Sequence, residues 1–154
     1  MARRLPHLAR GVRLMLDATA IDTAARTAWG EARGEGLCGM QAVLNVIGNR
    51  AAQPGWWGRD IISVCRAPWQ FSCWNADDPN AGKIASLNQS DPQYRTAHEL
   101  ALQLVAGTLV DLTDGADSYY RHGSPVPIWA LPRFFIKTIG HHDFYRIGLH
   151  GDDA

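Results

Sequence analysis

A glycine-rich segment between two helical patterns constrains the fold of this chain more than any other feature. Apolar residues repeat at helical spacing over residues 21–29, and they do so again over residues 38–51. Between these patterns lies Gly30–Gly36, with the sequence G-E-A-R-G-E-G. Its three glycines stop a helix and let the backbone approach a neighbouring segment closely. We therefore expect two buried helices joined by a tight connection that carries two carboxylates.

The rest of the chain predicts a mainly α fold, of the α+β class, with a small β-hairpin or irregular portion. A long helix is expected from Pro92 to about Thr113, with Asp91 as its N-cap and Gly115 as its stop. Other segments are expected as a short helix or extended piece (60–65), an aromatic-rich loop (66–80), a loop or hairpin (115–132) and a tail of alternating and clustered apolar residues (134–147). With 154 residues and no internal repeat or linker, the chain suits one domain.

Charge and hydropathy exclude several classes of function. Fifteen basic and fifteen acidic residues cancel, so no net field attracts nucleic acid or an anionic membrane. No apolar run reaches the roughly 20 residues of a membrane span, or the roughly 7–15 of a signal peptide core. We expect a basic arm over residues 1–18, a folded domain over 19–149 and a short tail over 150–154. The protein is expected to be made in the cytoplasm without a signal peptide and without stable membrane insertion.

Three cysteines leave two alternatives open. Cys65 and Cys73 lie close enough in sequence to form a disulfide, which would leave Cys38 over. Three buried, unreactive thiols are the favoured alternative. The chain contains no C-x-x-C motif, so zinc-ribbon and thioredoxin interpretations fail.

The glutamates of the glycine-rich segment are candidates for acid catalysis. Only three of the fifteen acidic residues are glutamates, and Glu31 and Glu35 both fall in this segment. Cleavage of a glycosidic bond needs a protonated carboxylic acid whose pKa is raised by burial. Glu31, at the end of a buried helix beside Trp29, would have that environment, whereas Glu35 is expected to be more exposed. Arg33 could hold either carboxylate, and a helix C-cap with a surface ion pair is the structural alternative.

Four ordered blocks of sequence carry a resemblance to a known family. They are W-G-E-A-R-G-E-G with its continuation (29–50), P-W-Q-F-S-C-W (68–74), G-A-D-S-Y-Y (115–120) and W-A with I-G-H-H-D-F-Y (129–145). Together they resemble the SleB-type cell-wall hydrolases, which include spore-cortex-lytic enzymes and related phage or prophage lysins. The resemblance covers about residues 20–147. It implies a lysozyme-like fold and cleavage of peptidoglycan glycan strands between N-acetylmuramic acid and N-acetylglucosamine.

The resemblance also implies a mechanism with one essential carboxylate and no cofactor or metal. Family members act as lytic transglycosylases, and the motif carries their essential glutamate onto Glu31. Glu31 would protonate the leaving glycosidic oxygen and then take the proton of the muramic acid C6 hydroxyl, which closes onto C1. The chain departs from the family pattern at Ser118 and Tyr120. It also lacks the signal peptide and peptidoglycan-binding domain of the spore enzymes, so we expect a stand-alone, monomeric lysin released through a holin or carried in a phage-like particle.

Substrate contacts are predicted from two of these blocks. The wall of the cleft is expected to contain Gln70, Phe71, Ser72 and Trp74, with Ser72 bonding to the reacting sugar and the aromatic rings stacking on sugar faces. Tyr119 is favoured over Tyr120 as a residue of the cleft. Glu35 is a further candidate for the substrate site and the alternative to Glu31 as the acid. Core packing is the competing interpretation for Trp74, and also for Trp69.

Three other functions stay open from the sequence. A muramidase would hydrolyse the same bond with a second acid, supplied by one of Asp60, Asp77, Asp78 and Asp143. A zinc-dependent amidase or peptidase would draw its ligands from His122, His141, His142 and Asp143. Adjacent histidines on an extended segment point to opposite faces, which argues against a shared metal. A glycan-binding module without catalysis would rely on stacking by tryptophan and tyrosine alone.

Overall fold

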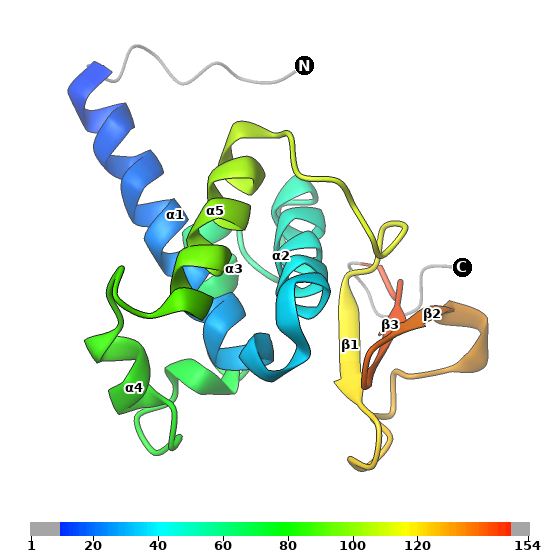
Figure 1. The fold of residues 1–154 in the computed structure, drawn as a ribbon. Coiled ribbons are helices and arrows are strands. Elements are labelled where there is room, and N and C mark those ends of the chain that lie inside the picture. The colour runs from blue at the N-terminus through cyan, green and yellow to red at the C-terminus, as the bar shows by residue number, and fades with distance from the viewer. Residues whose placement is uncertain (1–9, 149–154) are drawn as a thin grey trace.

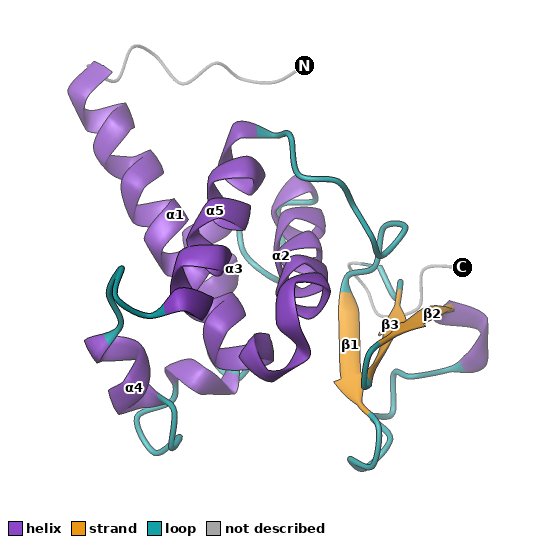
Figure 2. Ribbon diagram, in the orientation of Figure 1, coloured by secondary structure: helices purple, strands orange, loops and turns teal. Residues whose placement is uncertain are grey.

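Helices form one part of the molecule and a small antiparallel sheet forms the other (Figures 1 and 2). The computed structural model describes residues 10–148. The elements are α1 (Arg10–Ala32), η1 (Arg33–Glu35), α2 (Gly36–Ala52), α3 (Ile61–Arg66), η2 (Ser72–Trp74), α4 (Ala81–Ser86), α5 (Pro92–Ala106), β1 (Ser118–Arg121), η3 (Pro132–Phe134), β2 (Phe135–Ile139) and β3 (His142–Tyr145). This architecture confirms the predicted mainly α fold with a small β portion.

Small side chains let the three long helices pack closely. Helix α1 presents the fully buried Ala24 and Ala28 to the core, and α5 presents Ala97 and Ala101. Larger apolar residues of α2 (Met40, Val43, Leu44 and Ile47) fill the remaining space of the same core. Burial of apolar surface stabilises the folded state by about 25 cal/mol per Å². The buried contacts of this core therefore hold the end of α1 in place, and with it Glu31.

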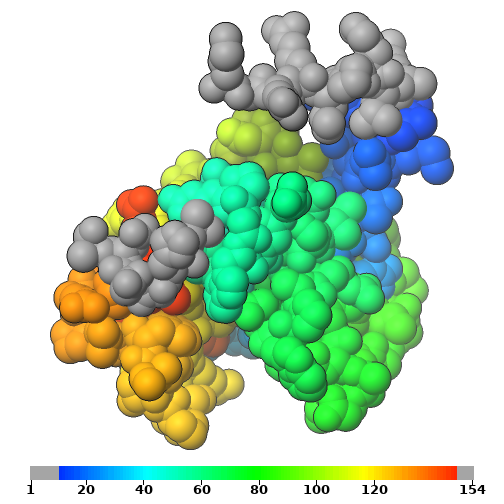
Figure 3. Space-filling model, turned by 180° about the vertical axis from the view of Figure 1, so that it is seen from behind, coloured from blue at the N-terminus to red at the C-terminus, as the bar shows by residue number. Residues whose placement is uncertain are grey.

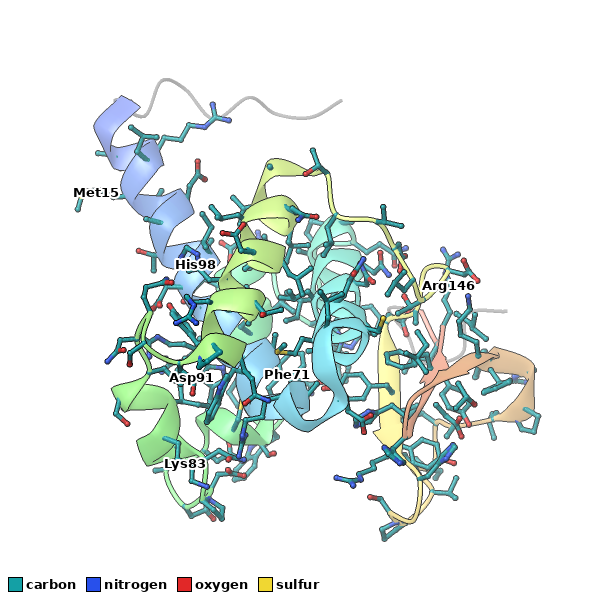
Figure 4. The ribbon with its side chains drawn as sticks, in the orientation of Figure 1. Met15, Phe71, Lys83, Asp91, His98 and Arg146 are labelled. Atoms are coloured by element: carbon teal, nitrogen blue, oxygen red, sulfur yellow. The ribbon has the colours of Figure 1, made fainter. Side chains whose placement is uncertain are left out.

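Helix α1 begins earlier than the sequence predicts. The periodic pattern starts at Ile21, whereas the helix starts at Arg10 and includes the second half of the expected basic arm. Its first turns extend beyond the other helices (Figure 1), and Met15 lies there with 72% of its surface exposed (Figure 4). These first turns bury no face of the helix, so they need no periodic apolar residues, and the sequence pattern therefore does not reveal them. Residues 1–9 and the predicted tail lie outside the described residues, and the predicted domain boundaries stay predictions.

Helix α5 ends earlier than the sequence predicts. Asp91 caps its start, as predicted, by accepting a hydrogen bond from the backbone N–H of Tyr94, and Pro92 follows in the first turn. The helix stops at Ala106, however, because Gly107 adopts the left-handed conformation with φ of 76°. Apolar residues beyond Gly107 mimic a continued helix in sequence, but they belong to a loop. Side chains of α2 hold this loop by donating to the backbone oxygen of Val110.

The sheet places β1 against the helical part. The strand order is β1-β3-β2, with Tyr119 of β1 opposite Phe144 of β3. Phe144 is buried together with Ala42 and Val46, so this face of the sheet packs on α2. Asp117 fixes the end of the described chain, because its carboxylate accepts hydrogen bonds of 2.9 Å from the N–H groups of residues 147 and 148.

The cysteines are free thiols rather than a disulfide pair. Cys65 and Cys73 are buried, as the favoured alternative predicts, but Cys38 is exposed near the start of α2. None of the helices in the described part of the chain has the length and apolar character of a membrane span.

Candidate active site

A groove separates two surfaces of the molecule. Viewed from behind, it runs between the green surface around α3 and α4 and the orange surface around β2 (Figure 3). The last turn of α1 brings Glu31 between the two sides. One oxygen of its carboxylate faces Cys73 in η2, and the other faces Tyr119 in β1. The carboxylate of Glu31 therefore links the helical side of the groove, at η2, to the sheet side, at β1.

Glu31 is half-buried and surrounded by hydrogen-bond donors. The backbone N–H of Cys73 lies 3.5 Å from Oε1, and the hydroxyl of Tyr119 donates to Oε2 over 3.2 Å. Gly30 permits this arrangement, because a Cβ atom there would lie 2.7 Å from the Cβ of Cys73. The close approach of η2 to α1 therefore depends on a glycine beside the carboxylate.

Burial raises the pKa of Glu31 above its ordinary value. Hydrogen bonds from the thiol and N–H of Cys73 and from the hydroxyl of Tyr119 lower the pKa in part, and the negative charge of Asp78 raises it. The balance favours a protonated carboxylic acid at a higher pH than in water. Such a group can donate a proton to a leaving oxygen.

Tyr119 is held as a protonated donor. Burial and the neighbouring charge of Glu31 raise the pKa of Tyr119 well above its ordinary value. Its ring meets the ring of His142 edge-on, with centroids 5.2 Å apart and planes at 90°, and it also packs on Phe144 at 5.5 Å. These contacts fix the direction of the hydroxyl, and they set Tyr119 apart from Tyr120, which packs against Trp129 and Tyr145.

Gln70 is positioned by a buried arginine. Arg50 donates to the backbone oxygen of Asp117 over 2.6 Å and to the side-chain oxygen of Gln70 over 3.3 Å. The same guanidinium lies 5.4 Å from the ring centre of Phe71. Phe71 is only 3% exposed and belongs to the helical core (Figure 4), so the structure differs here from the expected residue of the cleft wall. An aromatic residue in a loop cannot be assigned to wall or core by sequence alone.

Ser72 and Trp74 complete this wall in different ways. Ser72 is exposed. Trp74 is half-buried, its indole N–H donates to the hydroxyl of Thr27 over 2.9 Å, and the guanidinium of Arg66 lies 4.3 Å from its ring centre. Trp69, by contrast, is 85% exposed, which excludes core packing, and its backbone adopts a positive φ of 66°.

Glu35 is more enclosed than the sequence predicts. Its side chain is only 12% exposed, and its Oε1 lies 2.9 Å from Nδ1 of His141 and 3.8 Å from Nδ1 of His142. Burial alone would raise the pKa of Glu35, but the hydrogen bond and charge of His141 lower it on balance. Arg33, which could have held either carboxylate, instead donates to the side-chain oxygen of Asn80 over 3.0 Å. Sequence reasoning named the histidines but missed their pairing with Glu35, because His141 lies 106 residues from Glu35 along the chain.

The histidines proposed as zinc ligands are divided between two pairs. His141 and His142 face Glu35, whereas Nε2 of His122 lies 2.7 Å from the carboxylate of Asp143. Within residues 10–148, no three His, Cys, Asp or Glu side chains are grouped as a metal ion would require. The expectation that the adjacent histidines point to opposite faces is wrong, because His141 lies in the turn before β3 and not on an extended segment, so both rings face Glu35. Alternation along β3 does apply to His142 and Asp143, which lie on opposite sides of the strand.

Comparison with known proteins identifies the family. The sequence model of the cell wall hydrolase family matches residues 34–145, well over half of the chain. The chain belongs to the cell wall hydrolase family. The match begins just after Glu31, so the interpretation of this residue rests on the geometry above. No functionally curated protein is similar enough in sequence to match this cell-wall hydrolase.

Two solved structures of SleB-type enzymes resemble the cell-wall hydrolase. The catalytic domain of the Bacillus cereus SleB protein is 27% identical with a TM-score of 0.66, covering 84% of this chain and 91% of that one. The catalytic domain of the germination-specific lytic transglycosylase SleB from Bacillus anthracis is 25% identical with a TM-score of 0.65, covering 93% and 100%. These matches confirm the SleB-type family and its lysozyme-like, mainly α fold, and they make peptidoglycan degradation the general activity of the protein.

Proposed function

We propose that this cell-wall hydrolase cleaves the glycan strand between N-acetylmuramic acid and N-acetylglucosamine as a lytic transglycosylase. The proposal rests on the half-buried carboxylate of Glu31. Burial raises its pKa, and its two oxygens face hydrogen-bond donors from opposite walls of the groove. The similarity to a Bacillus anthracis enzyme named as a lytic transglycosylase supports the same reaction type.

The proposed reaction uses Glu31 twice. Protonated Glu31 donates its proton to the glycosidic oxygen as the bond from C1 to that oxygen breaks, which releases the N-acetylglucosamine end. The resulting carboxylate then removes the proton of the muramic acid C6 hydroxyl, whose oxygen bonds to C1 and gives a 1,6-anhydro end. Glu31 is protonated again, so the cycle balances without water. The donors on Tyr119 and Cys73 stabilise the carboxylate between the two steps.

Substrate contacts in this proposal come from both sides of the groove. The exposed hydroxyl of Ser72 and the side chain of Gln70, held by Arg50, belong to the wall formed by η2 and the segment before it. Tyr119, whose hydroxyl donates to Glu31, and the half-buried Trp74, whose indole donates to Thr27, offer apolar surface in this proposal. Phe71 has no part in the proposal, because it is buried in the core.

A muramidase is the second candidate function, and one observation favours it. The negative charge of Asp78 raises the pKa of Glu31, so a second carboxylate acts on the site. Asp78 is half-buried, and its carboxylate accepts a hydrogen bond from the N–H of Asn80 over 2.8 Å. In a hydrolytic reaction, a carboxylate that stays ionised would activate a water or bond to C1.

Mass spectrometry of fragments from purified sacculi tests both candidates. Sacculi are digested by the wild type, Glu31→Gln, Asp78→Asn and the control Glu99→Gln, whose side chain is exposed on α5. Anhydro ends that are lost only in Glu31→Gln would support transglycosylation. Reducing ends that are lost in both Glu31→Gln and Asp78→Asn would support the muramidase. Free peptides whose release a chelator abolishes would contradict both and support a zinc amidase.

Release through a holin and a monomeric state are also part of the proposal. Sedimentation of the purified protein should give the mass of a single 16.9 kDa chain. Expression in the cytoplasm should lyse cells only when a holin is supplied with it, and lysis without a holin would contradict that route.

A further inference from the structure

Two carboxylate–histidine pairs lie on opposite sides of β3. On one side, Glu35 contacts two adjacent histidines, His141 of the β2–β3 turn and His142 at the start of β3. On the other side, Asp143 contacts His122 of the loop after β1. The two carboxylates are almost equally enclosed, with 12% and 15% of their side-chain surfaces exposed. Only the first pair lies on the side that leads to Glu31.

Two glycines leave the space that the side chain of Glu35 occupies. An added Cβ at Gly39 of α2 would lie 2.2 Å from the Cβ of Glu35. An added Cβ at Gly140 would lie 2.5 Å from its Oε2, and Gly140 has a positive φ of 58°. Any larger side chain at either position would displace the carboxylate. Helix α2 and the β2–β3 turn therefore both leave room for this one side chain, which joins the helical part to the sheet.

A chain of contacts leads from Glu35 to Glu31. Nδ1 of His142 lies 3.8 Å from Oε1 of Glu35, and the His142 ring meets the Tyr119 ring edge-on at 5.2 Å. The hydroxyl of Tyr119 donates to Glu31 over 3.2 Å. We propose that Glu35 is a positioning residue, which clamps the β2–β3 turn so that His142 holds Tyr119 against the Glu31 carboxylate. This inference rests on the proposed function of Glu31, and it replaces the predicted contact of Glu35 with substrate.

The charges around the clamp suit this role. His141 and His142 face Glu35 from the turn and β3, and Arg121 and His122 act on His142 from the β1 side. Burial lowers the pKa of His142, so its ring is neutral at pH 7 and packs on Tyr119 as an aromatic group. His141, 71% exposed, supplies the close contact to Glu35. The carboxylate is thereby hydrogen-bonded to one histidine and lies 3.8 Å from the other, which packs on Tyr119.

The pH dependence of kcat/KM on soluble, uncross-linked glycan strands tests the proposal. Its alkaline limb reports the pKa of the proton donor, and the hydroxyl of Tyr119 lowers that pKa. Glu35→Ala should move the limb upward, in the same direction as Tyr119→Phe, and reduce kcat at least threefold with KM changed less than twofold. The double variant should move the limb no further than Tyr119→Phe alone. Glu35→Gln, which keeps the shape and one acceptor oxygen, should restore part of both effects.

The matched control is Asp143→Ala, which removes the other carboxylate–histidine pair of the same strand. It should lower Tm and leave the alkaline limb in place. The proposal would be overturned if Glu35→Ala and Asp143→Ala lowered Tm equally and neither moved the alkaline limb. It would also be overturned if Glu35→Ala and Tyr119→Phe shifted the alkaline limb additively in the double variant. A tenfold rise in KM at unchanged kcat would assign Glu35 to substrate binding. If Glu35→Ala does not fold, the same comparison is made with Glu35→Gln. Full activity of Glu31→Gln would instead refute the proposed function, a separate outcome.

Discussion

Replacement of Tyr119 by phenylalanine gives the sharpest test of how the site tunes its acid. The variant removes one hydroxyl, which donates to Oε2 of Glu31 over 3.2 Å, and keeps the ring that packs on His142 and Phe144. A hydrogen bond to a charged group contributes about 1.5–3 kcal/mol, and the length of this bond favours the lower value of about 1.5 kcal/mol. Since one pKa unit corresponds to about 1.4 kcal/mol, the pKa of Glu31 should rise by about one unit.

Two consequences of this variant have opposite directions, which makes the test specific. The alkaline limb of kcat/KM should move up by about one pH unit, because Glu31 stays protonated to a higher pH. The rate at the optimum should fall by roughly tenfold, because the carboxylate formed during bond cleavage loses the same donor. Activity is measured as release of soluble fragments from labelled peptidoglycan between pH 4 and 9.

The control for this measurement is Tyr120→Phe. Tyr120 is the next residue of β1, but it packs against Trp129 and Tyr145, away from Glu31. It should leave the limb unchanged. A Tyr119→Phe enzyme whose limb stays in place, or moves to lower pH, would refute the idea that this hydroxyl stabilises the ionised form of the catalytic acid.

Three further predictions concern stability around the site. Because burial raises the pKa of Glu31 above its ordinary value of 4.5, the folded state binds the proton more tightly than the unfolded state, and ionisation at neutral pH destabilises the fold. Glu31→Gln should therefore raise Tm by roughly 3 °C at pH 7, about 1 kcal/mol, and the gain should fade as pH falls toward 4.5, as calorimetry at several pH values would reveal. Gly30→Ala should destabilise by about 1–3 kcal/mol and abolish fragment release, since the new methyl group would displace Cys73 from the carboxylate; normal activity would contradict the close approach. Asp117→Ala should cost about 2–3 kcal/mol in urea unfolding, because two buried N–H groups lose their acceptor, and an unchanged midpoint would show that another group replaces it.

The helices could be predicted where burial and local chemistry agree. Helix α2 runs from Gly36 to Ala52, within two residues of the pattern over 38–51, because most of its length is buried and its periodicity is complete. The start of α5 follows from Asp91 and Pro92, which act through local hydrogen bonding. Its end was predicted too late, because apolar residues beyond Gly107 continue the helical pattern in the sequence although Gly107 already ends the helix in the left-handed conformation.

The sequence singled out Glu31 and Tyr119 separately, but it could not predict which residues of the site pair with each other. A scarcity of glutamate and a glycine-rich helix end draw attention to Glu31, and these are local features. Its donor Tyr119 lies 88 residues away, and the partner of Glu35 lies 106 residues away, so both pairings depend on how the sheet packs on α2. The same limit explains Phe71 and Ser72, where adjacent residues of one motif divide between core and surface according to the direction of the chain.

The opposing influences on Glu31 fit a group that must act as acid and then as base. Burial and the charge of Asp78 raise its pKa, so the proton is available for the leaving oxygen. The donors on Cys73 and Tyr119 lower it, so the carboxylate is stable enough to wait for the C6 hydroxyl. A carboxyl group whose pKa was raised by burial alone would hold its proton too tightly to give it to the leaving oxygen in the first step. A group whose pKa was lowered by donors alone would be ionised and would have no proton to give. Glu31 has both, and the donors come from the two walls of the groove, so the relative position of helices and sheet sets the balance between the two steps.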